Sequence, residues 1–329
     1  MFTRPDELAD SDVADALARG WGLRATQVEY AAVGFGSHHW RAVAEANRWF
    51  VTVDDLEGCR RSAIDTNDDA MLRLAAALEV ARSLEDSGLS FVVAPLLTLS
   101  GSILHPVDGR FVASLFPHVD GETHSWGAYP TREDRLAILE LVVQVHRAAA
   151  VANARVDDCA IPGRDALGPL LADDGIEWGP GPYAEAAGDL LSRHRVALGR
   201  VLDRYDALVV DVMSRPDRWV QTHGEPHRGN TITTVGGVVL VDWDTALIAP
   251  PERDLWSLID EDSSIAAEYS SRTGVDIDDA ALEMYRLWWD LCEVSIYSAQ
   301  FRAPHGETAD IRVAWEGLQT YLDPTRWDA

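Results

Sequence analysis

The chain has 329 residues, of which 47% are hydrophobic, so it is long enough to bury a large core and to form two lobes. It carries 28 basic and 54 acidic residues, a formal net charge of −26. A protein this acidic repels the phosphates of nucleic acids and of anionic membranes, which makes both poor partners, and it attracts cationic small molecules. The simpler alternative is that the negative charge only maintains solubility.

The basic residues are all arginine, because the chain contains no lysine. No step can therefore use a Walker-type lysine or a Schiff base. The cysteines Cys59, Cys159 and Cys292 are far apart and match neither a disulfide framework nor a zinc site, which suits a reducing compartment. No run approaches the ~20 apolar residues that a membrane span needs, and residues 1–7 lack the apolar segment of a signal peptide. We expect a cytoplasmic protein.

The first part of the chain is expected to form a small antiparallel sheet that carries one helix. An opening helix is predicted over residues 6–20 and a longer helix over residues 68–87, each from apolar residues at helical spacing. Strand patterns cover residues 27–33, 40–44, 48–53, 91–97 and 111–116. The glycine-containing segment between the first two strands is either an ordinary turn or a hairpin whose backbone amides cover phosphates.

Helices dominate the rest of the chain. They are predicted over residues 131–150, 183–211 and, in several segments, 251–322, with a loop rich in Pro, Gly and Asp over residues 157–182 and a Gly-Gly hairpin over residues 231–241. The change of character at residues 117–121 predicts a lobe boundary, with one lobe over residues 1–117 and the other over 118–329. The predicted fold class is therefore α+β with two lobes.

The segment that begins at Val220 carries the most specific pattern in the chain. His223 is followed two residues later by Glu225 and seven residues later by Asn230, and Asp242 comes after the predicted hairpin. Phosphoryl transfer requires these residue types. An acid orients the attacking hydroxyl and takes its proton, while an amide oxygen and a carboxylate hold Mg²⁺ against the nucleotide phosphates.

The same segment has a second interpretation, since His223 and His227 flank an acid as the ligands of helical zinc proteases do. Gly224 and Pro226 argue against it, because a glycine and an interior proline would break the helix that this zinc site requires. We therefore set the metalloprotease reading aside.

Together with the later segment Pro-Pro-Glu-Arg-Asp-Leu-Trp at residues 250–256, the pattern resembles the aminoglycoside phosphotransferase family, which has a protein-kinase-like fold. The resemblance covers most of the chain, and its diagnostic residues lie in 221–256. It implies that Glu225 is the catalytic base and that Asn230 and Asp242 bind Mg²⁺.

The resemblance also implies roles for the neighbouring residues. His223 is expected to brace the loop, and His227 to lie near the transferred phosphate. Asp244 is expected to be a second, weaker metal ligand or a structural residue. Arg253 and Asp254 are expected to brace the loop without a catalytic role.

The resemblance further places ATP or GTP, the phosphate donor, in the first lobe. The expected contacts are a turn over the phosphates and a hinge beside the purine, at Gly34, Gly36, Ser37, Leu115 and Pro117. Thr52 stands where related kinases have a strand lysine that holds the phosphates. This missing lysine and the presence of Glu225 in place of an aspartate are departures from the family pattern. Either the site is built around a glutamate, or catalysis is impaired.

The acceptor is expected on a helix near the C-terminus. Asp290, Glu293 and Tyr297 lie at positions i, i+3 and i+7 beside Trp288 and Trp289, so one face could bind an amino sugar or another cation. The alternative is an amphipathic helix that buries its tryptophans and exposes its acids.

Three functions remain open from the sequence. We expect a Mg²⁺-dependent phosphotransferase that moves a nucleotide γ-phosphate to a hydroxyl of a cationic small molecule, an aminoglycoside or a related antibiotic. The second hypothesis is a catalytically impaired, kinase-like protein that binds a small molecule or a partner. The third is a small-molecule kinase of metabolism or antibiotic biosynthesis. No obligate protein partner is evident.

Overall fold

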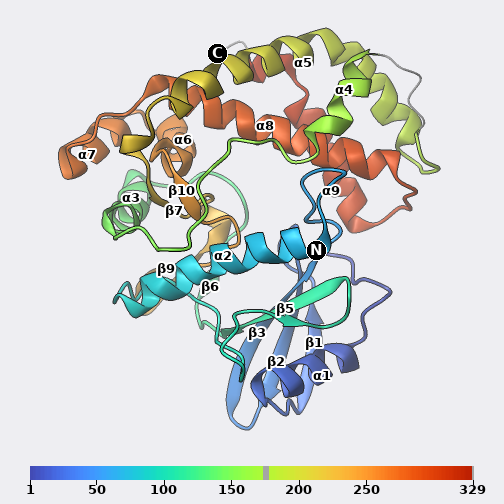
Figure 1. The fold of residues 1–329 in the computed structure, drawn as a ribbon, viewed down its shortest axis with the longest axis vertical. Coiled ribbons are helices and arrows are strands. Elements are labelled where there is room, and N and C mark those ends of the chain that lie inside the picture. Colours follow the sequence, from blue (N-terminus) through green and yellow to red (C-terminus); the bar gives the residue numbers. More distant parts are fainter. Residues whose placement is uncertain (173–177, 328–329) are drawn as a thin grey trace.

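The computed structural model describes residues 1–172 and 178–327, and it places a sheet below a largely helical C-terminal part (Figure 1). The sheet is antiparallel with the strand order β1-β2-β3-β5-β4. Its strands are β1 (Gln27–Ala31), β2 (His38–Ala44), β3 (Asn47–Asp55), β4 (His105–Pro106) and β5 (Phe111–Pro117). The predicted α+β architecture with two parts is confirmed.

Two helices cover the two faces of this sheet. Helix α1 (Asp10–Trp21) buries Val13 and Leu17 against Trp40 and other inward side chains of the strands. Helix α2 (Asn67–Asp86) covers the other face, and its core continues into the C-terminal part. The side chain of Thr66 accepts a hydrogen bond from the backbone of Asp69 and so begins α2 with a capping box.

The strand predicted over residues 91–97 is wrong. Phe91, Val92 and Ala94 are buried in the core beside α2, but the segment forms only an isolated bridge between Val92 and Leu240. Pro95 lacks the N–H that a central strand must donate, which explains why an apolar run stays irregular here. The segment instead leads from α2 to β4 and contacts the C-terminal part through the bridge to Leu240.

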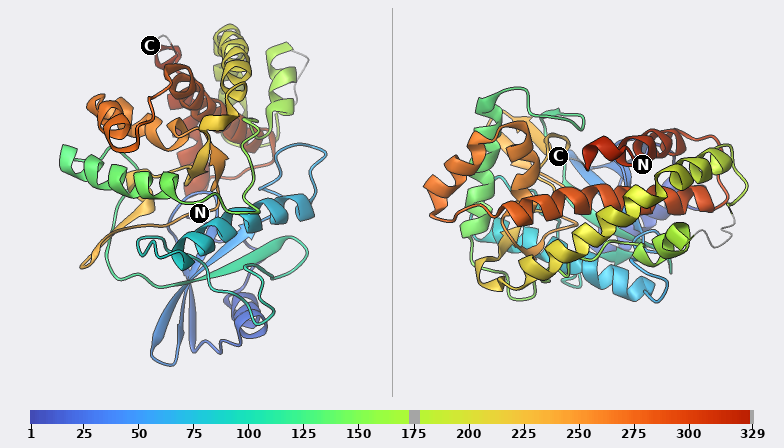
Figure 2. Two further views of the ribbon diagram at one scale, coloured as in Figure 1. Left: turned by 60° about the vertical axis from the view of Figure 1, so that its left-hand side comes forward. Right: turned by 90° about the horizontal axis from the view of Figure 1, so that it is seen from above.

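The C-terminal part is built from helices that pack around two cores. The helices are α3 (Arg132–Arg147), α4 (Arg164–Ala172), α5 (Ala184–Met213), α6 (Glu252–Glu261), α7 (Ser264–Thr273), α8 (Asp279–Arg302) and α9 (Ala309–Tyr321). Helices α5 and α8 run side by side across the top of this part (Figure 2). Helix α4 lies within the predicted loop 157–182, of which residues 173–177 are outside the described residues.

Short strands form two further small sheets. β7 (Val220–Thr222) pairs with β10 (Leu247–Ala249), and β8 (Thr231–Thr234) pairs with β6 (Glu122–Thr123) and β9 (Gly237–Leu240). The hairpin predicted over residues 231–241 is therefore present. Within the described ranges, no helix is long and apolar enough to cross a membrane.

Candidate functional site

The loop from His223 to Asn230 lies between β7 and β8, and its last residues form a 3-10 turn. His223 is fully buried, and its ring holds the loop from inside. Nε2–H donates to the carbonyl of Val241 at 3.0 Å, and Nδ1 accepts from the backbone N–H of Glu225 at 3.2 Å. Burial lowers the pKa of His223 to about 4, so the imidazole is neutral near neutral pH. The predicted bracing role matches these contacts.

Asp254 on α6 holds the backbone at the start of the same loop. Its carboxylate accepts the backbone N–H of His223 at 2.8 Å and that of Gly224 at 2.6 Å. The ring of His146 on α3 donates to it from Nε2 at 3.1 Å and accepts from the hydroxyl of Tyr269 at 2.9 Å. Burial is the largest single effect and acts to raise the pKa of Asp254, but the bond from His146 and the electrostatic effects of His146, His223 and Arg253 together outweigh it, so the pKa lies below its ordinary value.

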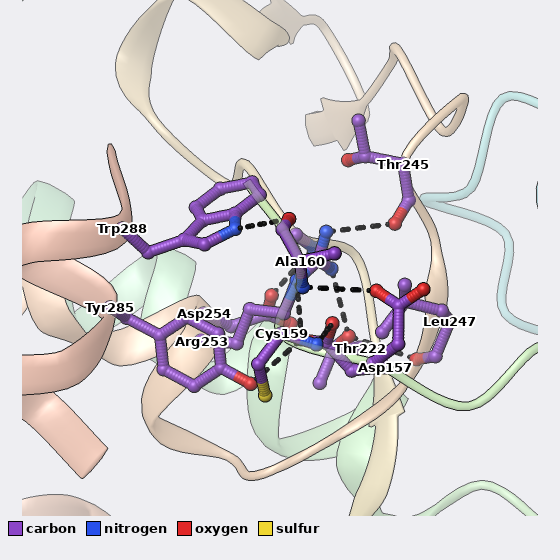
Figure 3. Close-up of polar contacts among 12 residues, drawn as sticks. Asp157, Cys159, Ala160, Thr222, Thr245, Leu247, Arg253, Asp254, Tyr285 and Trp288 are labelled. Atoms are coloured by element: carbon purple, nitrogen blue, oxygen red, sulfur yellow. Dashed lines mark hydrogen bonds and ion pairs between the residues drawn. The ribbon is translucent and has the colours of Figure 1, made fainter. Parts of the chain in front are cut away.

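Arg253 connects the loop to three other segments (Figure 3). Its guanidinium donates to the hydroxyl of Thr222 at 3.1 Å and to the carbonyl of Thr245 at 2.9 Å, and it lies 3.8 Å from the carboxylate of Asp157. Gly224 allows this approach, because a Cβ there would lie 2.4 Å from a guanidinium nitrogen. Its φ of +106° also favours glycine.

Glu225 presents a carboxylate that is partly open to solvent, with 27% of the side chain exposed, 3.6 Å from Nε2 of His227. Burial acts to raise the pKa of Glu225, but His227, Arg253 and His223 together outweigh it, so the pKa lies below its ordinary value. The carboxylate is therefore ionised near neutral pH and can accept a proton.

Asn230 and Asp242 are held in the same unit as Glu225. The side-chain amide of Asn230 donates to the backbone carbonyl of Glu225 at 3.1 Å, and the backbone carbonyl of Asn230 accepts from the backbone N–H of Val241 at 3.0 Å. Asp242 has a φ of +67°, an uncommon conformation for a residue other than glycine, which is often maintained at functional sites.

The carboxyl groups of Asp242 and Asp244 lie close to one another and keep contact with solvent. The protein around them disfavours charge. Desolvation by the surrounding protein raises the pKa of Asp242 to about 6, with the charge of Glu225 acting in the same direction. The same desolvation and the charge of Asp242 raise the pKa of Asp244 well above its ordinary value. A cation between these groups would relieve their repulsion.

The donor atoms of Asn230 and Asp242 fit Mg²⁺, which prefers amide and carboxylate oxygens. In the part of the chain that is described, no three His, Cys, Asp or Glu side chains converge as a complete metal centre. An ion at Asn230 and Asp242 would therefore take further oxygens from water or from phosphates, as Mg²⁺ commonly does.

The predicted glycine turn joins β1 to β2. Gly34 and Gly36 have φ values of +72° and +96°, and the hydroxyl of Ser37 donates to Asp54 at 2.6 Å. Burial raises the pKa of Asp54 to about 6. At the tip of the turn, the ring of Phe35 meets that of Tyr297 on α8 with centroids 6.0 Å apart, so the turn reaches the C-terminal part.

The remaining residues predicted for the nucleotide site lie on β3 and β5. Thr52 contacts Nδ1 of His39 on β2 through its hydroxyl at 3.3 Å. Leu115 is buried, and its carbonyl already accepts from the backbone of Leu96 at 2.7 Å, while Pro117 has no N–H to donate.

The residues of helix α8 that face the loop differ from the predicted set of Asp290, Glu293 and Tyr297. Trp289, Glu293 and Tyr297 form one stripe at i, i+4 and i+8, and the ring of Trp289 stacks on that of Trp126 at 5.1 Å. Asp290 lies off this stripe, since its carboxylate is buried and takes two hydrogen bonds from Arg326, at 2.7 and 3.0 Å. Asp290 therefore forms an internal ion pair with Arg326 in place of the predicted contact with a substrate.

Sequence reasoning missed several polar residues that the fold brings to the site. His39, Asp54 and His146 come from β2, β3 and α3, and each meets its partner across a long stretch of sequence or an adjacent strand. A signal existed only for Asp54, an acid at the end of an apolar strand. For His146, a histidine in the last turn of an amphipathic helix gives no indication of its buried partner.

Comparisons with known proteins give two matches in sequence. A model of the phosphotransferase enzyme family matches residues 27–290. Protein StrN of Streptomyces griseus is 30% identical over 261 residues, which cover 76% of this chain and 77% of that protein.

Similar solved structures extend over nearly the whole chain. Spectinomycin phosphotransferase APH(9)-Ia in complex with ADP and spectinomycin has a TM-score of 0.73 at 14% identity and covers 98% of this chain and 100% of that one. Amicoumacin kinase hAmiN in complex with AMP-PNP, Ca²⁺ and Ami has a TM-score of 0.59 at 15% identity, with 99% and 94% covered. These likenesses show that the fold is the kinase-like, bilobal fold expected from the sequence.

Proposed function

The chain belongs to the phosphotransferase enzyme family, and on this premise we propose that it transfers the γ-phosphate of ATP or GTP to a hydroxyl of a cationic small molecule with Mg²⁺. One observation carries the proposal. An ionised carboxylate, Glu225, and two oxygen ligands, Asn230 and Asp242, are joined by the bonds from Asn230 to Glu225 and from Val241 to Asn230. Phosphoryl transfer requires these groups at fixed separations.

Glu225 has the role of base in this proposal. Its carboxylate accepts the proton of the acceptor hydroxyl as the oxygen forms a bond to the γ-phosphorus, and the bond from that phosphorus to the β-phosphate oxygen breaks. The nucleoside diphosphate leaves with the electron pair. His227, 3.6 Å from the carboxylate, keeps it ionised and orients it.

Asn230 and Asp242 are the residues that would hold Mg²⁺, with Asp244 beside them. The ion would neutralise the negative charge of the phosphates. The turn of Gly34, Gly36 and Ser37 would cover these phosphates. The purine would bind at the hinge. The proposed boundary between the two lobes lies there, after Pro117.

The acceptor site in this proposal is the stripe of α8 that faces the loop. Burial raises the pKa of Glu293 to about 7, and the charge of Glu225 adds to this effect. A cationic amine of the acceptor would stabilise the ionised form of Glu293 by pairing with it. Trp126, Trp289 and Tyr297 would contact the body of the molecule. The solved structures named for spectinomycin and amicoumacin support a small-molecule acceptor.

A non-catalytic binding protein is the second candidate, since the chain lacks lysine and has Glu225 where related enzymes have an aspartate. Thermal unfolding with and without Mg-nucleotide separates the two candidates. A nucleotide present at 100 times its Kd stabilises the folded state by about 2.7 kcal/mol. A raised melting temperature with MgATP or MgGTP, followed by labelled phosphate on an acceptor from a panel of hydroxylated amines, supports the enzyme. If neither nucleotide raises the melting temperature at millimolar concentration, the binding protein is supported instead.

A further inference from the structure

A row of polar side chains crosses the sheet beneath the glycine turn. His39 on β2 pairs in register with Thr52 on β3, and Thr52 pairs with Ser114 on β5. Their neighbours Trp40 and Val51 face the core shared with α1. Because side chains alternate between the faces of a sheet, the row lies on the opposite face, toward the C-terminal part.

The ring of His39 is held in one orientation within this row. Nδ1 lies 3.3 Å from the hydroxyl of Thr52, and the ring lies 5.0 Å from that of Phe50 at an interplanar angle of 31°. The other nitrogen, Nε2, lies beneath the turn, since a Cβ on Gly34 would approach it to 3.1 Å. With a φ of +72°, Gly34 lets the turn come this close.

A phosphate chain bound under the glycine turn would need a hydrogen-bond donor from the protein beside Nε2 of His39. Asp54, which is bonded to Ser37 at the end of the same turn, adds a carboxyl group to the site, and the chain has no lysine to offset it. Burial lowers the pKa of His39 to about 3, with the amino group of Met1 and His38 adding to the effect. The imidazole is therefore neutral, and its free nitrogen donates if Nδ1 accepts from Thr52.

We propose that His39 binds the phosphate chain of the donor nucleotide through Nε2–H, and that Thr52 holds it in the required tautomer by donating to Nδ1. The inference rests on the proposed function, which places a nucleotide under the turn. A neutral donor thus stands where related kinases use the charge of a lysine. His39 is a binding residue that acts on the phosphates, whereas Thr52 is a positioning residue that acts through His39.

The test compares a nucleotide with its nucleoside. Isothermal titration gives the Kd of MgATP and of adenosine, or of MgGTP and guanosine if the protein prefers guanine, for wild type, His39→Ala, His39→Gln, Thr52→Val and Arg41→Ala. His39→Ala is expected to weaken the nucleotide by about tenfold or more while the nucleoside changes less than about twofold, since a bond to a charged group is lost. Thr52→Val should show a smaller loss of the same kind, and His39→Gln, which retains a donor, should recover part of the affinity.

Arg41 provides the matched control, because it lies on the same strand and the same face but pairs with Phe50, two residues further from the turn. Its variant should bind both ligands as wild type does. Equal nucleotide affinity in wild type, His39→Ala and His39→Gln would overturn the inference and leave the proposed function intact. A wild-type protein that binds neither MgATP nor MgGTP would overturn both. Should His39→Ala fail to fold, the same comparison between Thr52→Val and wild type decides, and equal nucleotide affinity in these two proteins would overturn the inference.

Discussion

The carboxylate of Glu225 lies 3.6 Å from the imidazole of His227, in a loop whose backbone is held by Asp254. His227 lowers the pKa of Glu225 and so helps to keep the carboxylate ionised. This arrangement favours a site built around glutamate over a site damaged by it.

Changing Glu225→Asp should lower kcat by about a hundredfold, because the carboxylate retreats from the acceptor hydroxyl by one methylene and loses its contact with His227. Glu225→Gln should lower kcat at least as much, because the amide cannot take the proton. The Kd of Mg-nucleotide should stay within about threefold in both variants. An aspartate variant that is faster than wild type would show that the glutamate impairs catalysis.

Changing Asp254→Asn should cost about 2–4 kcal/mol of unfolding free energy, because the buried carboxylate accepts two backbone N–H groups and the ring of His146. Denaturant unfolding measures the change. Asp260→Asn on the same helix is the control, since its pair with Arg286 is about one third exposed and should contribute about 0–1 kcal/mol. Equal losses in the two variants would contradict the bracing role of Asp254.

Substitutions of Glu293 and Asp290 on α8 should affect different properties of the protein. Glu293→Gln should raise the KM for a cationic acceptor by about tenfold with little change in unfolding free energy, because the side chain faces the loop. Asp290→Asn should instead cost about 1–3 kcal/mol of unfolding free energy, because it breaks the bonds from Arg326. Acceptor kinetics and denaturant unfolding of both variants test whether Glu293 binds the acceptor and Asp290 stabilises the fold. A KM that rises in Asp290→Asn but not in Glu293→Gln would reverse this assignment.

The folded protein should lose stability in mild acid partly through His223. Its pKa is about 4 in the folded state and about 6.5 when unfolded, so the unfolded state binds more protons between these values. Its contribution is present above pH ~6.5 and decreases as the pH falls toward 4, by up to about 1.4 kcal/mol per pH unit. The raised pKa of Asp54 acts oppositely, so the measurement compares wild type with His223→Asn across this range. Parallel slopes for the two proteins would refute the contribution.

The sequence predicted the fold class and singled out the loop from His223 to Asn230 because both depend on local patterns. Apolar periodicity revealed the helices, and the spacing of His223, Glu225 and Asn230 reflects a single loop. The positions of Asp290 and His39 depended on distant partners instead. Arg326, 36 residues from Asp290, determines where that carboxylate points, and strand register brings His39 beside Thr52. Neither partner can be found from helical spacing or from a turn motif.

The most direct test of the account measures Mg²⁺-dependent transfer of labelled γ-phosphate from ATP or GTP to hydroxylated amines, in wild type and in Asp242→Asn. The carboxylate of Asp242 is the proposed charged ligand for Mg²⁺, so the amide variant should fold but transfer phosphate at least about a hundredfold more slowly at saturating nucleotide. Undiminished transfer by Asp242→Asn would contradict the metal site. No transfer by wild type to any acceptor, without binding of Mg-nucleotide, would contradict the phosphotransferase itself.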